Sequence, residues 1–315
     1  TPTSGTQVNI GWEPEFLLAK NVTSANDWSI VDTMRGFTAG NDEYLLANKS
    51  QAGIDYPLYV PTPTGFTVSF TANNDAYIYM AIRRPHKPPT AGTEVFAVGV
   101  DSGSGEPSAT SGFPVDMAIR TYNGGQAQRR VNAARINQGK FLYMDGAEAE
   151  GSTTNFNFDY PNGAGNFNIT NYYYYMFKRA PGFFDAVTYE GNSTQQTSIS
   201  HNLGVVPEVI IARVRNGTGN WNMYHKEIGN GLIRLNLNNA AITGYDYWQS
   251  SGNVHTATTF DLATLAGANA SGSSYVAYLF ATLDGVSKVG SYTGTGSNVN
   301  VDCGFTAGAR FVLIK

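Results

Sequence analysis

Apolar and polar residues alternate along most of this chain, in short runs that end at glycine, proline or asparagine. Such a period of two is typical of β-strands, whose successive side chains point to opposite faces. In "AYIYMAI", residues 76–82, both alternating faces are bulky and apolar. This segment is therefore predicted to be a central strand that is covered on both sides. The faces are Tyr77, Tyr79 and Ala81 on one side, and Ile78, Met80 and Ile82 on the other.

Two such segments recur along the chain with a spacing near 100 residues. One is a glycine followed by an apolar strand, as in "GWEPEFLLAKN" and "GVVPEVIIARV", and its glycines lie 101, 92 and 100 residues apart. The other is rich in tyrosine, as in "AYIYMAIRRP", "YYYYMFKRAP" and "YVAYLFATLDG". Recurrence at a fixed spacing is the sequence signature of repeated structural units. The leading glycines are Gly11, Gly112, Gly204 and Gly304, and the tyrosine segments begin at Ala76, Tyr172 and Tyr275.

Each repeat contains six or seven predicted short strands, separated by turn signals. Asn-Gly pairs, which suit tight hairpin turns, occur at 123–124, 162–163, 216–217 and 230–231. Short strands at this spacing predict an all-β protein made of tandem antiparallel β-sandwich modules, of the jelly-roll or lectin-like kind.

The repeat predicts the division of the chain. A first module covers 1–88 and lacks its opening strands, and two further modules cover 89–182 and 183–285. Residues 286–315 have two interpretations. They begin a fourth repeat of a longer array, which we favour, or they supply strands that close the first module.

Composition narrows the class of protein. Only 14% of residues are charged, against about 25% in ordinary globular proteins, and the net charge is −4. The chain has no basic stripe for a nucleic-acid backbone and no apolar run long enough to cross a membrane, so neither partner is expected. One cysteine, Cys303, permits no disulfide framework, and its alternating surroundings predict a buried thiol. The basic residues that follow the tyrosine segments are predicted to be solvent-exposed: Arg83, Arg84, Lys178 and Arg179.

The search for chemistry gives no catalytic residue, metal ligand or cofactor. No two of the four histidines are spaced as a helical zinc pair, and no nucleophile elbow, phosphate-binding loop or dinucleotide fingerprint occurs. The chain contains carboxylates of the kind that glycan hydrolysis uses, among them Asp159 and Asp185, but their spacing does not show that any two of them come together. We therefore predict a protein that is not an enzyme.

One loop is a candidate binding site. The segment "GYDYWQSSGN" brings three aromatic rings and an amide together, which is the combination that binds sugars. The alternative is that Trp248 packs beneath a long loop. The predicted glycan- or receptor-binding residues are Tyr245, Tyr247, Trp248 and Gln249.

Several long segments resemble a known family. Residues 184–226, with "HNLG" and "PE" before "VIIAR", and residues 288–315 are similar to repeats in tail-fibre and other virion proteins of tailed phages, especially marine ones. Linking stretches such as "YMFKRAPGFFD" are also similar. The family is a domain of unknown function, so the resemblance implies a virion surface component and no catalytic residues.

The expected function follows from the repeat and this resemblance. We expect a virion structural protein, on the extracellular surface of the particle, that forms a tail fibre, a spike or a capsid decoration. Its expected partners are further copies of itself, with a trimer by analogy to fibres, other virion proteins and a host-surface glycan. The alternative is a carbohydrate-binding adhesion module, and a glycan hydrolase comes third.

Overall fold

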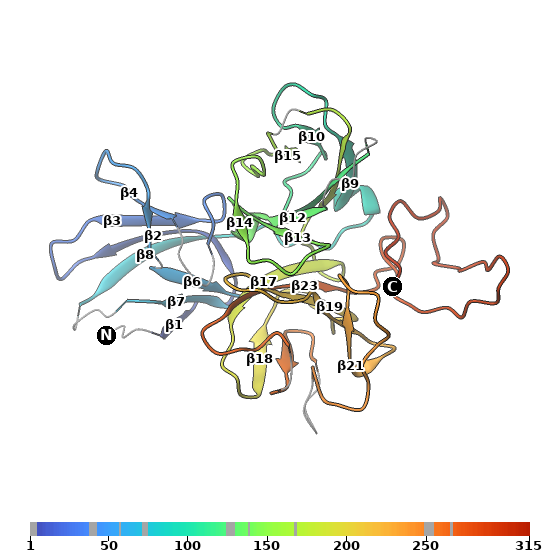
Figure 1. The fold of residues 1–315 in the computed structure, drawn as a ribbon. Helices are drawn as coiled ribbons and strands as arrows, with labels where there is room; N and C mark the ends of the chain where they lie inside the picture. Colours follow the sequence, from blue (N-terminus) through green and yellow to red (C-terminus); the bar gives the residue numbers. More distant parts are fainter. Residues whose placement is uncertain are drawn as a thin grey trace.

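The computed structural model describes residues 5–37, 43–56, 58–70, 75–123, 130–137, 139–166, 169–248, 255–264 and 267–315. It is all-β, with 40% strand and 2% helix, as the sequence predicted. The strands form small antiparallel sheets in a four-blade, propeller-like arrangement. In Figure 1, the N-terminal sheet lies at the left, the middle sheet above the centre and the C-terminal sheet below it.

The N-terminal sheet has the strand order β5-β4-β3-β2-β8. A separate sheet, β1-β7-β6, shares its core, in which Leu17, Val31 and Phe66 are buried. The strands are β1 (Thr6–Asn9), β2 (Pro14–Asn21), β3 (Trp28–Asp32), β4 (Glu43–Leu46), β5 (Ile54–Asp55), β6 (Tyr59–Thr62), β7 (Gly65–Val68) and β8 (Tyr77–Arg83).

The middle sheet has the order β14-β13-β12-β11-β16-β9, accompanied by the pair β10-β15. Two short 3-10 helices, η1 (Gly92–Glu94) and η2 (Arg135–Asn137), flank its strands. The strands are β9 (Phe96–Val100), β10 (Ala109–Thr110), β11 (Met117–Tyr122), β12 (Val131–Ala134), β13 (Lys140–Tyr143), β14 (Gly151–Ser152), β15 (Gly163–Ala164) and β16 (Tyr172–Phe177).

The C-terminal sheet has the order β17-β23-β19-β20-β21, accompanied by the pair β18-β22. One apolar core joins it to the middle sheet, because Phe177 of β16 packs with Phe184 of β17 and Tyr278 of β23. The strands are β17 (Phe184–Glu190), β18 (Gln196–Ser200), β19 (Val209–Val214), β20 (Asn222–His225), β21 (Gly229–Arg234), β22 (Thr259–Leu262) and β23 (Ser274–Phe280).

The same pair of strands is adjacent in all three large sheets. The strand after a leading glycine pairs antiparallel with the tyrosine strand, as β2 with β8, β11 with β16 and β19 with β23. Gly11, Gly112 and Gly204 have φ values of 84°, 85° and 76°. This left-handed region is readily adopted only by glycine, which explains why glycine recurs just before this strand.

The prediction for the first tyrosine strand is wrong. β8 lies at the edge of its sheet and is not covered on both sides, and Ile78, Met80 and Ile82 are each at least half exposed. Its counterparts β16 and β23 are covered at that edge by β9 and β17. Alternation reports which faces are apolar, but it does not report whether a neighbouring strand is present.

Residues 286–315, all of which are described, form no strand. Loops of this segment extend to the right of the sheets in Figure 1, while Val286, Val289 and Phe311 pack against the apolar core. Cys303 lies here in irregular backbone and is partly exposed, so the prediction of a buried thiol within a strand is wrong. None of the described helical segments has the length and apolar character needed to cross a membrane.

Candidate functional site

A buried arginine lies where the three large sheets meet. Arg179 follows β16 and its side chain is only 4% exposed. Its two terminal nitrogens, Nη1 and Nη2, each donate a hydrogen bond of 2.8 Å to one carboxylate oxygen of Glu13, which precedes β2. Its Nε donates to Oδ1 of Asp185 in β17, at 2.6 Å. One guanidinium therefore ties the middle sheet to both of the others.

Two further side chains complete this group. Arg84, which follows β8, donates from Nη1 to the carbonyl oxygen of Arg179 at 3.3 Å, and its Nη2 lies 3.9 Å from Oδ1 of Asp185. Asn202 donates its backbone N–H to Oδ2 of Asp185 at 2.7 Å and its side-chain amide to Glu13. We call Glu13, Arg84, Arg179, Asp185 and Asn202 the junction cluster.

The junction cluster balances two positive charges with two negative ones inside the protein. Burial alone would lower the pKa of Arg179, but the carboxylates of Asp185 and Glu13 outweigh it and hold that pKa above its usual value. Burial likewise opposes the charge on Asp185, and the two arginines outweigh it, so the pKa of Asp185 is lowered. Both groups stay charged at neutral pH. Asp185, which the sequence analysis named among carboxylates of the type that glycan hydrolysis needs, is an ion-pair partner of Arg179.

The sequence analysis missed the junction cluster. It predicted that Arg84 and Arg179 are exposed, which is wrong, whereas Arg83 is exposed as predicted. A signal was present, because each buried arginine stands two positions after the last apolar residue of its strand, Ile82 or Phe177. The carboxylates that meet these arginines, Glu13 and Asp185, come from distant segments of the chain.

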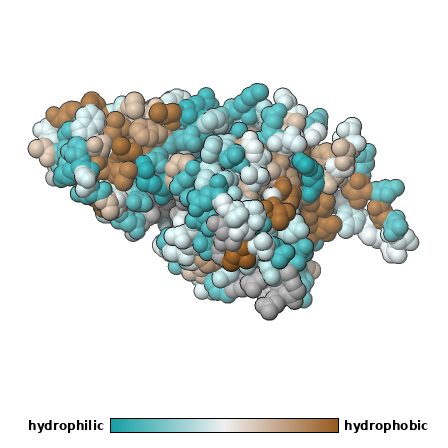
Figure 2. All heavy atoms as spheres, turned by 90° about the horizontal axis from the view of Figure 1, so that it is seen from above, coloured by the Kyte–Doolittle hydropathy of each residue, from teal (hydrophilic) through white to brown (hydrophobic). Residues whose placement is uncertain are grey.

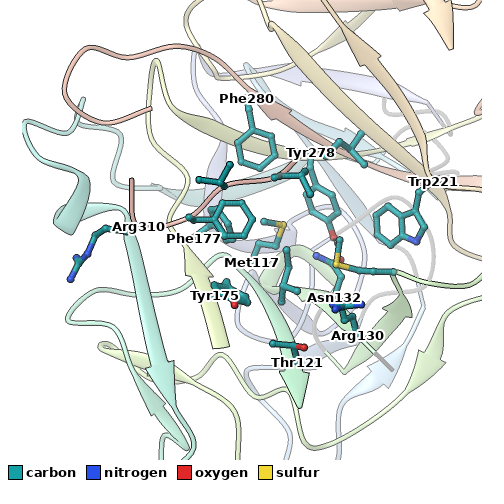
Figure 3. Close-up of a pocket in the computed structure, with 16 residues that line it drawn as sticks. Met117, Thr121, Arg130, Asn132, Tyr175, Phe177, Trp221, Tyr278, Phe280 and Arg310 are labelled. Carbon is teal, nitrogen blue, oxygen red and sulfur yellow. Dashed lines mark hydrogen bonds between the residues drawn. The ribbon is translucent and has the colours of Figure 1, made fainter. Parts of the chain in front are cut away.

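A cleft of about 340 Å³ lies between the middle and C-terminal sheets. Figure 3 shows Met117, Tyr175 and Phe177 on one side and Trp221 and Tyr278 on the other. The hydroxyl of Tyr278 donates to Oδ1 of Asn132 at 2.7 Å, and the Trp221 indole donates to the carbonyl oxygen of Tyr143 at 2.8 Å.

The C-terminal segment covers part of this cleft, since the ring of Phe311 lies 5.3 Å from that of Tyr175 and 5.7 Å from that of Phe177. Apart from Thr121, Arg130, Asn132 and Arg310, the lining side chains are apolar or aromatic. Such a lining favours packing of one sheet against another.

Two buried histidines lie in the core of the C-terminal sheets. Nδ1 of His201 accepts the backbone N–H of Leu203 at 3.2 Å, and Nδ1 of His255 accepts that of Asp261 at 3.2 Å. Burial lowers the pKa of both, and the nearby His201 contributes to the lowered value of about 4 for His255. Among the described residues, no group of three or more potential ligands is placed to hold a metal ion.

The structure separates the members of the predicted binding loop. Tyr245 is 61% exposed, and its ring lies 6.2 Å from that of the partly buried Tyr247. Trp248 is only 1% exposed and packs against Tyr224 in the core, so its ring offers no open face to a ligand. Gln249 lies outside the described residues. Glycan binding at Tyr245 and Tyr247 stays a prediction.

Comparison with known proteins gives one match. The family described as "Domain of unknown function (DUF7483)" matches residues 176–315, from the end of β16 to the C-terminal segment. No curated protein and no solved structure matches the chain.

We predict that Arg179→Met destabilises the protein by about 3–5 kcal/mol, because two buried carboxylates then lose their cation. Urea denaturation followed by tryptophan fluorescence measures the change. The matched control is Lys178→Met, which removes a partly exposed charge one position earlier and is expected to cost less than about 1 kcal/mol. Equal midpoints for the two variants would show that the junction cluster is not structurally important.

Stability is also predicted to fall as the pH is lowered from about 6.5 to 4. The pKa of His255 is about 4 when folded and 6.5 in the ordinary state, so the unfolded chain takes up the proton first. The stabilisation is therefore complete above pH 6.5, and roughly 3 kcal/mol is lost by pH 4.

Chemical denaturation at each pH tests this prediction, with His255→Asn as the comparison, since its amide oxygen still accepts a hydrogen bond but does not titrate here. The variant should show a shallower decline than the unmodified protein. Parallel curves for the two proteins would refute the assignment to His255.

Proposed function

We propose that this chain is a structural protein of a tailed-phage virion, located on the extracellular surface of the particle as a tail fibre, spike or capsid decoration. It is built of β-sandwich modules at 1–88, 89–182 and 183–285 and assembles with further copies of itself. The observation that carries the proposal is the recurring strand order. In three sheets a glycine-led strand lies between a tyrosine strand and the next strand along the chain: β8-β2-β3, β16-β11-β12 and β23-β19-β20.

The way the sheets are joined supports a mechanical role. The junction cluster and the aromatic core between the middle and C-terminal sheets hold several modules as one body. Arg179 and Asp185, whose pKa values are strongly shifted, form ion pairs that connect the sheets. A rigid body of several modules, with low charge, suits a densely packed extracellular assembly. The sequence resemblance to virion repeats supplies the phage context.

A second candidate, glycan binding at the host surface, is favoured by one specific observation. Tyr245 exposes most of its side chain beside the partly buried ring of Tyr247, which gives an aromatic platform on a surface loop. This activity is compatible with a structural role, because receptor-binding appendages combine both.

The structural proposal predicts that the purified chain self-associates. Mass photometry over nanomolar to micromolar concentrations should show a species of defined stoichiometry, such as a trimer, that grows with concentration. Negative-stain electron microscopy should show the same species as uniform particles. A chain that stays monomeric throughout this range would count against an assembly role.

The glycan proposal predicts binding to at least one carbohydrate on a glycan array and a loss of at least about tenfold in affinity for Tyr245→Ala, which removes one stacking platform. Tyr56→Ala, a similarly exposed tyrosine outside this loop, is the matched control and should bind as the unmodified chain does. Equal binding by the two variants would remove the loop from the proposal.

A further inference from the structure

The free edge of β8 is unusually apolar for an edge strand. Ile78, Tyr79, Met80 and Ile82 are 53%, 47%, 50% and 52% exposed. Figure 2 shows hydrophobic atoms gathered over the N-terminal lobe. Edge strands normally protect their unpaired backbone groups with charges, prolines or bulges, because a bare edge accepts another strand. Along β8 only Arg83, at its end, is charged.

The corresponding edge is occupied in the other two sheets. β9 pairs antiparallel with β16, and β17 pairs antiparallel with β23 over seven residues. The residues of β8 and β23 can be matched one by one through their pairing with β2 and β19. Tyr77 is opposite Asn21, ten residues after Gly11, and Tyr275 is opposite Val214, ten residues after Gly204. Among the described residues, no strand takes the corresponding place beside β8.

The chain contains a segment that corresponds to the missing neighbour. β17 is reached from β16 through a turn in which Phe184 donates its N–H to the carbonyl oxygen of Ala180, with Gly182 at φ 77°. After β23 the same turn recurs, with Ser287 donating to Leu283 and Gly285 at φ 72°. The first turn leads into a paired strand.

The second turn leads into residues 287–293, "SKVGSYT". Ser287 forms an isolated bridge with Leu283, and Val289 donates its N–H to Oγ1 of Thr282, whereas residues 290–293 are exposed and pair with none of the described strands. This segment also shares a tyrosine with β17, because Tyr292 stands five residues after Ser287 as Tyr189 stands five after Phe184. The described part of the chain thus carries both an open strand edge and a segment whose sequence matches the strand that covers this edge elsewhere.

We infer that residues 287–293 of a second copy of this chain add to the free edge of β8 as an antiparallel strand. This inference rests on the proposed self-assembly and names the contact that produces it. The two parts lie at opposite sides of one molecule in Figure 1, so the donor comes from another copy. A single added strand, in the place of β17, would give β8 the arrangement of the C-terminal sheets. The counterpart of β18 is already present, because β1 pairs with β7 as β18 pairs with β22.

The register follows from β17 on β23. There Tyr189 is opposite Tyr275 and Thr188 is opposite Val276, and the two tyrosine rings stack at 5.2 Å. Transferred to β8, Tyr292 of the donor lies opposite Tyr77, and Ser291 lies opposite Ile78. Because the donor and acceptor surfaces differ, the contact is head-to-tail, and it closes into a ring or extends into a filament.

A disulfide cross-link tests the register directly. On a Cys303→Ser background, chains carrying Ile78→Cys are mixed with chains carrying Ser291→Cys and oxidised. Side chains opposite each other in an antiparallel pair are close enough to form a disulfide. We expect covalent dimers in this mixture and at least about tenfold fewer when Ser297→Cys, an exposed serine outside the segment, replaces Ser291→Cys.

The outcomes separate this inference from the proposed function. Oligomers in mass photometry without the 78–291 cross-link would overturn strand addition and leave self-assembly standing, whereas a persistent monomer would contradict both. A double variant that cross-links within one monomer would show that the segment closes its own chain, which also overturns the second-copy contact. Independently, Ser291→Pro should raise the protein concentration needed for assembly by about tenfold, and Ser297→Pro should not.

Discussion

The arrangement of the sheets depends on the burial of one guanidinium. A charge removed from water is tolerated only when opposite charges and hydrogen bonds compensate for it. Arg179 receives this compensation from Glu13, before β2, and from Asp185, in β17. Neither carboxylate belongs to the middle sheet that carries the arginine. The charge is therefore balanced only when all three large sheets are in place, which makes their relative positions a condition of stability.

An apolar core also joins the middle and C-terminal sheets. Phe184 of the C-terminal sheet stacks on Phe280 at 4.8 Å and contacts Phe177 of the middle sheet at 5.9 Å. Trp221 and Tyr278 reach the middle sheet through hydrogen bonds to Tyr143 and Asn132. The N-terminal sheet has a core of its own and meets the others at the junction cluster and where Arg135 contacts Met34. Along its outer edge, β8 has no neighbouring strand among the described residues.

The sequence predicted the local features of this fold well. Alternation and turn signals predicted an all-β chain, and the recurring glycines correspond to left-handed residues just before the strands that pair with the tyrosine strands. These features depend on backbone geometry within a few residues, which a single sequence expresses directly. In the candidate loop, Tyr245 is exposed and Trp248 is buried against Tyr224, and glycan binding there stays a prediction.

What the sequence did not predict depends on distant segments. The burial of Arg84 and Arg179 requires Glu13 and Asp185, which lie up to 172 positions apart in the chain. The open edge of β8 depends on whether another strand is present, and the apolar faces of "AYIYMAI" are the same in either case. A period of two shows which face of a strand each side chain occupies. Whether a buried charge is compensated, or a strand edge is paired, depends on how the sheets assemble.

Small-angle X-ray scattering on the monomeric fraction at low concentration tests most directly whether the junction cluster makes the sheets one body. A chain of this length with all its sheets packed around one centre should have a radius of gyration of about 20–25 Å and a single-peaked distance distribution. A radius above about 30 Å, with separate peaks for modules spaced along a line, would contradict this account.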